Sequence, residues 1–385
     1  MSATLITGIG ELTTVDAEDR VLSDAAVVID DHVISWVGPS ASAPSADKRV
    51  DVGGRAMLPG WVDSHSHLVF AGDRAAEFVA RMAGEPYQAG GIGVTVAATR
   101  EASDQQLQEL VETRVWEALL GGTTCMETKT GYGLAVEQEL RSAKLAAEYA
   151  DEATFLGAHL VPEGISADDY VELVCGEMLA AVAPYTNWID VFCETGAFDV
   201  DQSRQVLEAG RAAGLGLRVH GNQLGHSGGV ALAVELRAAS VDHCNYLSAS
   251  DLEALAFSET VATVLPACDL STRAPLAPAR ALADAGADIA IASNCNPGTS
   301  YTSSMNFCVA TAVLQMGLTL PEAIAAATRG GAKALRRDDV GAISVGSRAD
   351  LHVLDAPSAT HLAYRPGMPL TWAVWRAGVG YGIEA

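Results

Sequence analysis

The chain has 385 residues, of which 49% are hydrophobic and 19% charged, so it can build a large core and is not intrinsically disordered. It carries 48 acidic and 24 basic residues, which gives a formal net charge of −24. This acidic surface argues against nucleic acid and anionic membranes as partners. A negatively charged substrate would need a local Arg or Lys.

The two ends of the chain share one pattern, in which short segments typical of β-strands are separated by turn residues. Such runs occupy residues 4–6, 26–29 and 33–37 near the start, and 349–354 and 372–375 near the end. Neither end has enough apolar residues for a core of its own. We therefore predict that residues 1–57 and 340–385 together form one small, discontinuous β-sandwich domain.

The middle of the chain, residues 58–339, alternates between strands and helices. Helix starts are indicated by Ser166 and Asp169 and by Thr319 and Glu322, which have capping-box spacing. This alternation favours a (β/α)₈ barrel over a doubly wound open sheet, because no Gly-rich phosphate loop follows the first strand. The eight predicted strands are 58–64, 123–129, 154–159, 189–194, 216–220, 239–243, 260–265 and 288–293.

Polar residues end several of these strands, where active sites of such barrels lie. His65 and His67 are two positions apart, so in an extended segment both side chains point to one side. His159, His220 and His243 end three further strands. We predict a metal site from this cluster, against the alternative that each histidine is a core residue bonded to a backbone carbonyl. The histidines predicted to be ordinary surface or loop residues are His32, His226, His352 and His361.

Specific motifs resemble the imidazolonepropionases, a family of the amidohydrolase superfamily. The segment 58–67, LPGWVDSHSH, is similar to the first-strand signature of the superfamily. The narrower family resemblance extends from the first strands to the last; its segments are 68–78, 97–103, 129–134, 157–159, 296–298 and 363–367. The resemblance implies hydrolysis of the ring C–N bond of 4-imidazolone-5-propanoate to N-formimidoyl-L-glutamate in histidine degradation. It also implies a homodimer.

The same resemblance assigns roles to individual residues. It implies that one Zn²⁺ or Fe ion is held by His65, His67 and His220, and that His243 lies beside it and polarises the scissile carbonyl. An ion of this kind makes hydroxide available near neutral pH. The substrate would be held by Arg74, Tyr87, Tyr132 and His159, with the Arg74 guanidinium pairing with the propanoate.

Two positions depart from the family pattern. Gln223 stands where a Glu that contacts ring and water is common; it can bind the ring but cannot act as a base. Asn294 replaces the Asp that would be a metal ligand and proton acceptor. Three explanations stay open: an engineered change that traps a complex, a natural change with His243 or another group moving the proton, or a paralogue that does not hydrolyse this ring.

Two other functions are therefore compatible with the sequence. The chain could hydrolyse another small carboxylate-bearing cyclic amide, or it could be a non-catalytic binding protein. We expect a cytoplasmic protein, because the N-terminus has no signal-peptide pattern, no membrane span is evident, and the seven cysteines form no C-x-x-C pair.

Overall fold

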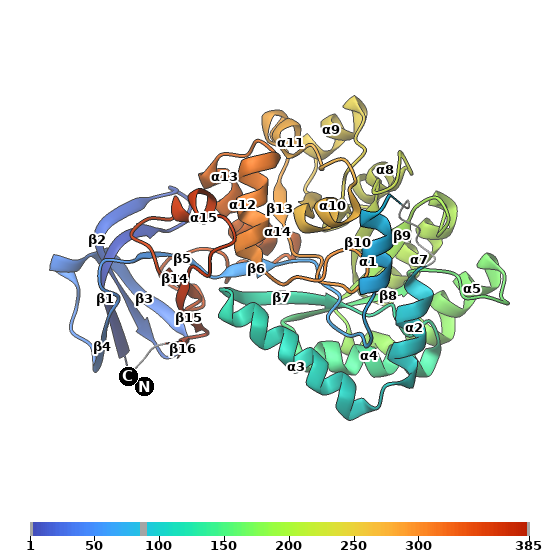
Figure 1. The fold of residues 1–385 in the computed structure, drawn as a ribbon, viewed down its shortest axis with the longest axis horizontal. Helices are drawn as coiled ribbons and strands as arrows, with labels where there is room; N and C mark the ends of the chain where they lie inside the picture. The colour runs from blue at the N-terminus through green and yellow to red at the C-terminus, as the bar shows by residue number, and fades with distance from the viewer. Residues whose placement is uncertain (1–2, 85–90, 383–385) are drawn as a thin grey trace. The chain divides into compact units, whose positions relative to one another are not determined.

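A computed structural model describes residues 3–84 and 91–382 of the chain (Figure 1). It divides into two compact units. One consists of Met1–Asp63, Trp116–Cys125 and Ser304–Ala385, and the other of Ser64–Val115 and Met126–Ser303.

The first unit contains an eight-stranded sheet built from both ends of the chain. Its order is β16-β15-β14-β5-β1-β2-β3, with β4 also paired to β1. The predicted β-rich ends therefore join in one sheet. The strands are β1 (Ala3–Thr13), β2 (Val21–Asp30), β3 (Val33–Pro39), β4 (Lys48–Asp51), β5 (Ala56–Pro59), β14 (Leu351–Leu354), β15 (Thr371–Arg376) and β16 (Val379–Tyr381).

Apolar residues of both chain ends form the core of this unit. Ile6, Ile9 and Leu12 of β1 pack with Leu351 and Val353 of β14, and all five are fully buried. These contacts require residues more than 330 positions apart in the sequence to meet. The sheet therefore depends on both ends being present.

His352 is also buried in this unit, so its prediction as a surface or loop residue was wrong. It lies in β14 with 0% exposure, and its Nε2 is 2.8 Å from Thr371 Oγ1. Gly122 has φ +100°, and a Cβ there would come within 2.6 Å of the His352 ring. In a short strand, successive side chains point to opposite faces of the sheet. The sequence therefore does not show whether a single histidine lies on the buried or the exposed face.

The second sheet has eight strands in the order β13-β12-β11-β10-β9-β8-β7-β6, and neighbouring strands from β7 to β13 are parallel. The segment after β6 closes the ring, because Asn294 N–H donates to His65 O at 2.9 Å and His67 N–H to Cys295 O at 3.0 Å. This confirms the predicted barrel. The strands are β6 (Trp61–Asp63), β7 (Thr123–Lys129), β8 (Glu152–Ala158), β9 (Trp188–Cys193), β10 (Gly216–Gly221), β11 (Ser240–His243), β12 (Val261–Val264) and β13 (Ile289–Ile291).

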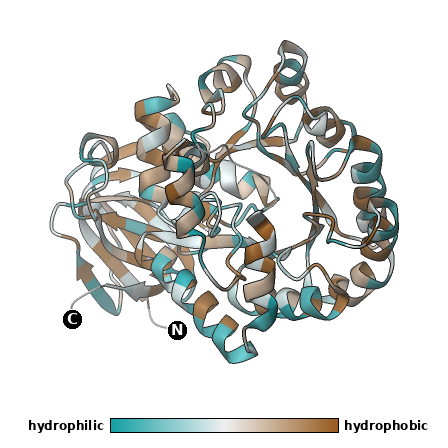
Figure 2. Ribbon diagram, turned by 45° about the vertical axis from the view of Figure 1, so that its right-hand side comes forward, coloured by the Kyte–Doolittle hydropathy of each residue, from teal (hydrophilic) through white to brown (hydrophobic). Residues whose placement is uncertain are grey.

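Helices alternate with these strands along the chain, and in Figure 2 their ribbons carry both apolar and polar residues. In α7 the buried residues Ser203, Val206, Leu207 and Gly210 follow the spacing of one helix face. The helices are α1 (Ala75–Met82), α2 (Ile92–Glu101), α3 (Asp104–Leu120), α4 (Val136–Tyr149), α5 (Ala167–Leu173), α6 (Leu179–Val182), α7 (Val200–Ala212), α8 (Gly229–Glu235), α9 (Ala249–Ala256), α10 (Pro266–Thr272), α11 (Ala279–Ala285), α12 (Met305–Gln315), α13 (Leu320–Ala325), α14 (Gly331–Ala334) and α15 (His361–Tyr364).

The predicted helix starts are present. Ser166 accepts a hydrogen bond from Asp169 N–H before α5, and Thr319 and Glu322 form a complete capping box before α13. A π-helical turn, Val174–Met178, joins α5 to α6, so residues 167–182 form one nearly continuous helix. Among residues 3–84 and 91–382, no helix has the length and apolar character needed to cross a membrane.

Candidate active site

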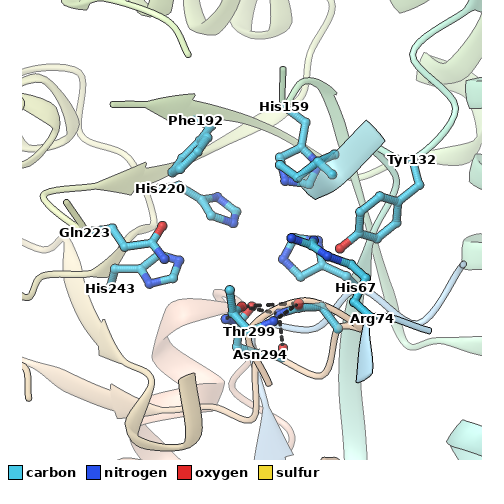
Figure 3. A pocket seen from close by; sticks show the side chains of 12 residues that line it. His67, Arg74, Tyr132, His159, Phe192, His220, Gln223, His243, Asn294 and Thr299 are labelled. Carbon is cyan, nitrogen blue, oxygen red and sulfur yellow. Dashed lines mark hydrogen bonds between the residues drawn. The ribbon is translucent and has the colours of Figure 1, made fainter. Parts of the chain in front are cut away.

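The five histidines predicted at strand ends lie together at the carboxyl end of the barrel strands. All five are buried, with exposures of 7% or less. Figure 3 shows four of them directed into one pocket: His67, His159, His220 and His243. His65 lies beneath them, with ring centroids 5.2 Å from His67 and 4.5 Å from His220.

Several of these rings are close enough to share one metal ion. A nitrogen of each of His65, His220 and His243 lies within 4.8 Å of the others. His67 Nε2 is 3.3 Å from His65 Nε2. Two unprotonated ring nitrogens at this distance repel each other unless a proton or a cation lies between them, so the arrangement suits a bound cation.

Two buried carboxylates lie close to the Nδ1 atoms of two of these rings. Asp242 Oδ2 is 2.6 Å from His65 Nδ1, and Asp190 Oδ2 is 3.0 Å from His220 Nδ1. A carboxylate that accepts the Nδ1 proton leaves Nε2 as the metal-binding atom, and this pairing is usual for metal-ligating histidines. The residues present therefore fit a metal ion.

The protonation of the rings agrees with this role. Burial lowers the pKa of His65, His67 and His243 well below the usual value, so each ring is neutral at pH 7. Only a neutral imidazole can bind a metal. Burial also lowers the pKa of His159 to about 4.

A buried charge network behind the histidines was missed from the sequence. Lys129 Nζ lies 2.9 Å from both Glu127 Oε1 and Asp190 Oδ2, and 3.8 Å from Asp242 Oδ2. Burial opposes the charge on Lys129, but Asp190 and Glu127 hold its pKa above the usual value. The available signal was the presence of charged residues inside otherwise apolar strands, as with Asp190 in Trp188–Cys193.

The predicted substrate-binding residues line the same pocket. Arg74, Tyr132, His159 and Gln223 all face it, whereas Tyr87 lies outside the described residues. Among the described residues that line the pocket, Arg74 is the permanently charged cation, and it donates to Glu77 from Nε and Nη2 at 2.7 and 2.8 Å. The polar and cationic lining of the pocket suits a small anionic molecule.

Asn294 and the loop after β13 complete the pocket. Asn294 has φ +51° and donates from Nδ2 to Thr299 Oγ1 at 3.4 Å. Asn296 Oδ1 accepts from the N–H groups of Gly298 and Thr299 at 2.9 and 2.8 Å, which fixes the turn. Asn296 and Thr299 face the pocket and were not assigned a role from the sequence, although Asn296 lies in the family-like segment 296–298.

Gln223 is positioned through its backbone. Its N–H donates to Glu194 Oε1, as does that of Leu224 at 3.3 Å. Burial raises the pKa of Glu194, while these N–H groups lower it. Glu194 was missed from the sequence; it follows β9 at the same end of the barrel and shapes the loop that carries Gln223.

The barrel fold and the buried histidines and aspartates together indicate the protein family. The model of the amidohydrolase family matches residues 56–369, and the chain belongs to that family. The family and the cluster of buried His and Asp groups support a metal cofactor. Solved structures share the fold: a triazine hydrolase variant has a TM-score of 0.78 with 18% identity, covering 99% of this chain and 94% of that chain. An adenosine deaminase from Xanthomonas campestris with bound zinc has a TM-score of 0.76 with 20% identity, covering 98% and 92%.

Relatives with high sequence identity indicate a narrower family within the amidohydrolases. Imidazolonepropionase of Saccharopolyspora erythraea is 67% identical over 383 residues, covering 98% of this chain and 99% of the relative. Imidazolonepropionase of Arthrobacter sp. strain FB24 is 66% identical with the same coverage, and that of Mycolicibacterium smegmatis is 58% identical, covering 98% and 97%. Within the amidohydrolases, the chain therefore groups with the imidazolonepropionases.

Proposed function

We propose that this protein hydrolyses 4-imidazolone-5-propanoate to N-formimidoyl-L-glutamate with one bound Zn²⁺ or Fe ion. The observation that carries the proposal is the joint presence, in one small pocket, of four histidines and one buried arginine. The near full-length identity to imidazolonepropionases supports the same substrate. In the reaction, one water adds to the ring carbonyl carbon, the ring C–N bond breaks, and the leaving nitrogen takes a proton.

The metal would be held by His65, His67 and His220, with Asn294 as a neutral oxygen ligand. When bound, such an ion polarises a carbonyl and lowers the pKa of a water toward ~7. Imidazole suits both Zn²⁺ and Fe, so the residues do not select between them.

The remaining groups would bind the substrate and move protons. Arg74 would pair with the propanoate carboxylate, while Tyr132, His159 and Gln223 hold the ring. His243 would donate toward the carbonyl oxygen, whereas Asn294 cannot accept a proton from water. Figure 3 shows Arg74 and Gln223 on opposite sides of the pocket, with the histidines between them.

The side chain of the substrate gives the sharpest test of this assignment. Zinc-loaded protein carrying Asn294→Asp is incubated with 4-imidazolone-5-propanoate and, separately, with the parent imidazolone that lacks the propanoate. We expect N-formimidoyl-L-glutamate by NMR, and a kcat/KM at least ~10²-fold lower for the truncated ring, because a buried charge-assisted pair is lost. No product from the full substrate would refute the assignment.

Asn294 favours one other function, that of a non-catalytic binder of the same ring. In that case the protein binds the substrate without consuming it, even with Asp restored at position 294.

We also propose a cytoplasmic homodimer. None of the seven cysteines, which all lie within the described residues, forms a disulfide, as suits a reducing compartment. Light scattering of the purified protein measures the mass directly, and a single-chain mass of 39.9 kDa would contradict the dimer.

A further inference from the structure

A partly buried cluster of three charged residues lies at the Arg74 side of the pocket. Glu77 is the centre of the cluster: it accepts two hydrogen bonds from Arg74, and Arg81 Nη1 lies 3.4 Å from its Oε1. The side chains of Arg74 and Arg81 are only 2% and 4% exposed, and Glu77 is 31% exposed. Arg81 also donates to Gly298 O at 3.0 Å, in the loop after β13.

The geometry leaves one face of Arg74 for a ligand. A guanidinium has two edges that match a carboxylate, and Glu77 occupies the edge formed by Nε and Nη2. The end formed by Nη1 and Nη2 is the other edge. Two glycines leave room for this end, because a Cβ at Gly298 would meet Nη1 at 2.2 Å and one at Gly91 would meet Nη2 at 2.2 Å.

The charges of the cluster do not favour an anion without Arg81. Arg74 and Glu77 alone make a neutral pair, and the protein around them has a net charge of −24. Arg81 brings the cluster to a net charge of +1. A buried charge acts through a lower dielectric than water, so this one extra charge matters at the distance of a bound carboxylate.

We propose that Arg81 is a positioning and selectivity residue: it cancels the charge of Glu77 so that Arg74 can bind a carboxylate-bearing ligand. This rests on the proposed function, in which Arg74 binds the propanoate. Glu77 then orients the guanidinium of Arg74, and Arg81 offsets the negative charge that Glu77 places beside the bound carboxylate.

Calorimetric binding to zinc-loaded protein tests the proposal without depending on turnover. The probes are imidazole-4-propanoate, which carries a carboxylate, and 4-methylimidazole, which does not. We expect Arg81→Gln to weaken binding of the first probe about tenfold and to leave the second unchanged within about twofold. Arg81→Lys keeps the charge and should stay within about threefold of the wild type for both probes.

The double variant Glu77→Gln/Arg81→Gln separates charge balance from a merely structural role. It has the same cluster charge as the wild type, so we expect it to recover affinity for imidazole-4-propanoate to within about threefold. A structural loss at Gly298 would not be repaired by changing Glu77. The double variant also supplies a test if Arg81→Gln alone does not fold.

The outcomes are distinguishable. Arg81→Gln that binds both probes like the wild type, weakens both equally, or is not rescued by Glu77→Gln overturns the role of Arg81. A wild-type protein that binds imidazole-4-propanoate no more tightly than 4-methylimidazole instead contradicts the proposed function, because Arg74 would then not recognise the carboxylate.

Discussion

At the scale of single residues, Asn294 changes both the charge and the proton chemistry of the site. An amide oxygen can bind a metal, but it adds no negative charge and cannot accept a proton at neutral pH. We therefore expect Asn294→Asp to bind Zn²⁺ about tenfold or more tightly than the wild type, because an anionic ligand replaces a neutral one.

Competition with a metal-sensitive dye measures this difference. Asn296→Asp is the matched control, since it places the same charge two residues away in a side chain that fixes the turn. Equal affinity of the wild type and Asn294→Asp would show that residue 294 is not a metal ligand.

His352 gives a prediction for stability that is independent of the active site. Burial lowers its pKa to about 3, whereas an unfolded histidine titrates near 6.5. Between these values the unfolded chain binds a proton that the folded chain does not, so stability falls as the pH is lowered through 6.5. From pH 7.5 to 5.5 this costs about 1.4 kcal/mol.

The variant His352→Gln removes that proton uptake and keeps an amide that can reach Thr371. Denaturant unfolding at the two pH values should show that it loses about 1.4 kcal/mol less than the wild type on acidification. His32→Gln, at a histidine that is 67% exposed, should retain the wild-type pH dependence. Identical pH dependence in all three proteins would contradict the burial argument.

At the scale of secondary-structure elements, the strands bring buried charges together. Lys129 ends β7, Asp190 lies within β9, and Asp242 lies within β11. Their side chains meet because parallel strands of one barrel present their carboxyl ends at one face. The network fixes the carboxylates that orient His65 and His220.

Removing the cation of this network should destabilise the barrel strongly. Lys129→Met removes a positive charge that lies beside the buried carboxylates of Glu127, Asp190 and Asp242. Breaking a buried ion pair by removing one partner costs about 3–5 kcal/mol of stability. Thermal unfolding measures the loss. Lys144→Met, at an exposed lysine, is the control and should change stability by less than about 1 kcal/mol. Equal melting temperatures for the two variants would contradict the role of the network.

The strands and their terminal histidines could be predicted from the sequence, but the buried charges could not. Strand positions and the histidines that end them were predictable, because apolar runs and polar termini are local patterns. Lys129 and Asp190 were not assigned, since strands buried on both faces show no alternation that marks an inward position. Glu77 and Arg81 look like an ordinary exposed helix pair four residues apart; only the fold shows that Arg81 is buried against Gly298.

At the scale of the whole molecule, metal binding should stabilise the fold. The ligands come from segments that are far apart in the sequence and meet only when the barrel is formed, so the metal binds the folded state preferentially. At a hundredfold excess over Kd this adds about 2.7 kcal/mol. We expect chelation to lower the melting temperature and Zn²⁺ to restore it, while His220→Ala should show no such shift. A shift of equal size in His220→Ala would place the metal elsewhere.

The most direct measurement of the central claim is the rate at which zinc-loaded protein consumes 4-imidazolone-5-propanoate, compared with its Asn294→Asp variant. We expect the variant to open the ring about 10²–10⁴ times faster than the wild type, because a positioned general base contributes that much. Equal rates would show that the base is another group, with His243 the first to be substituted. If neither protein consumes the substrate, the proposed function is wrong.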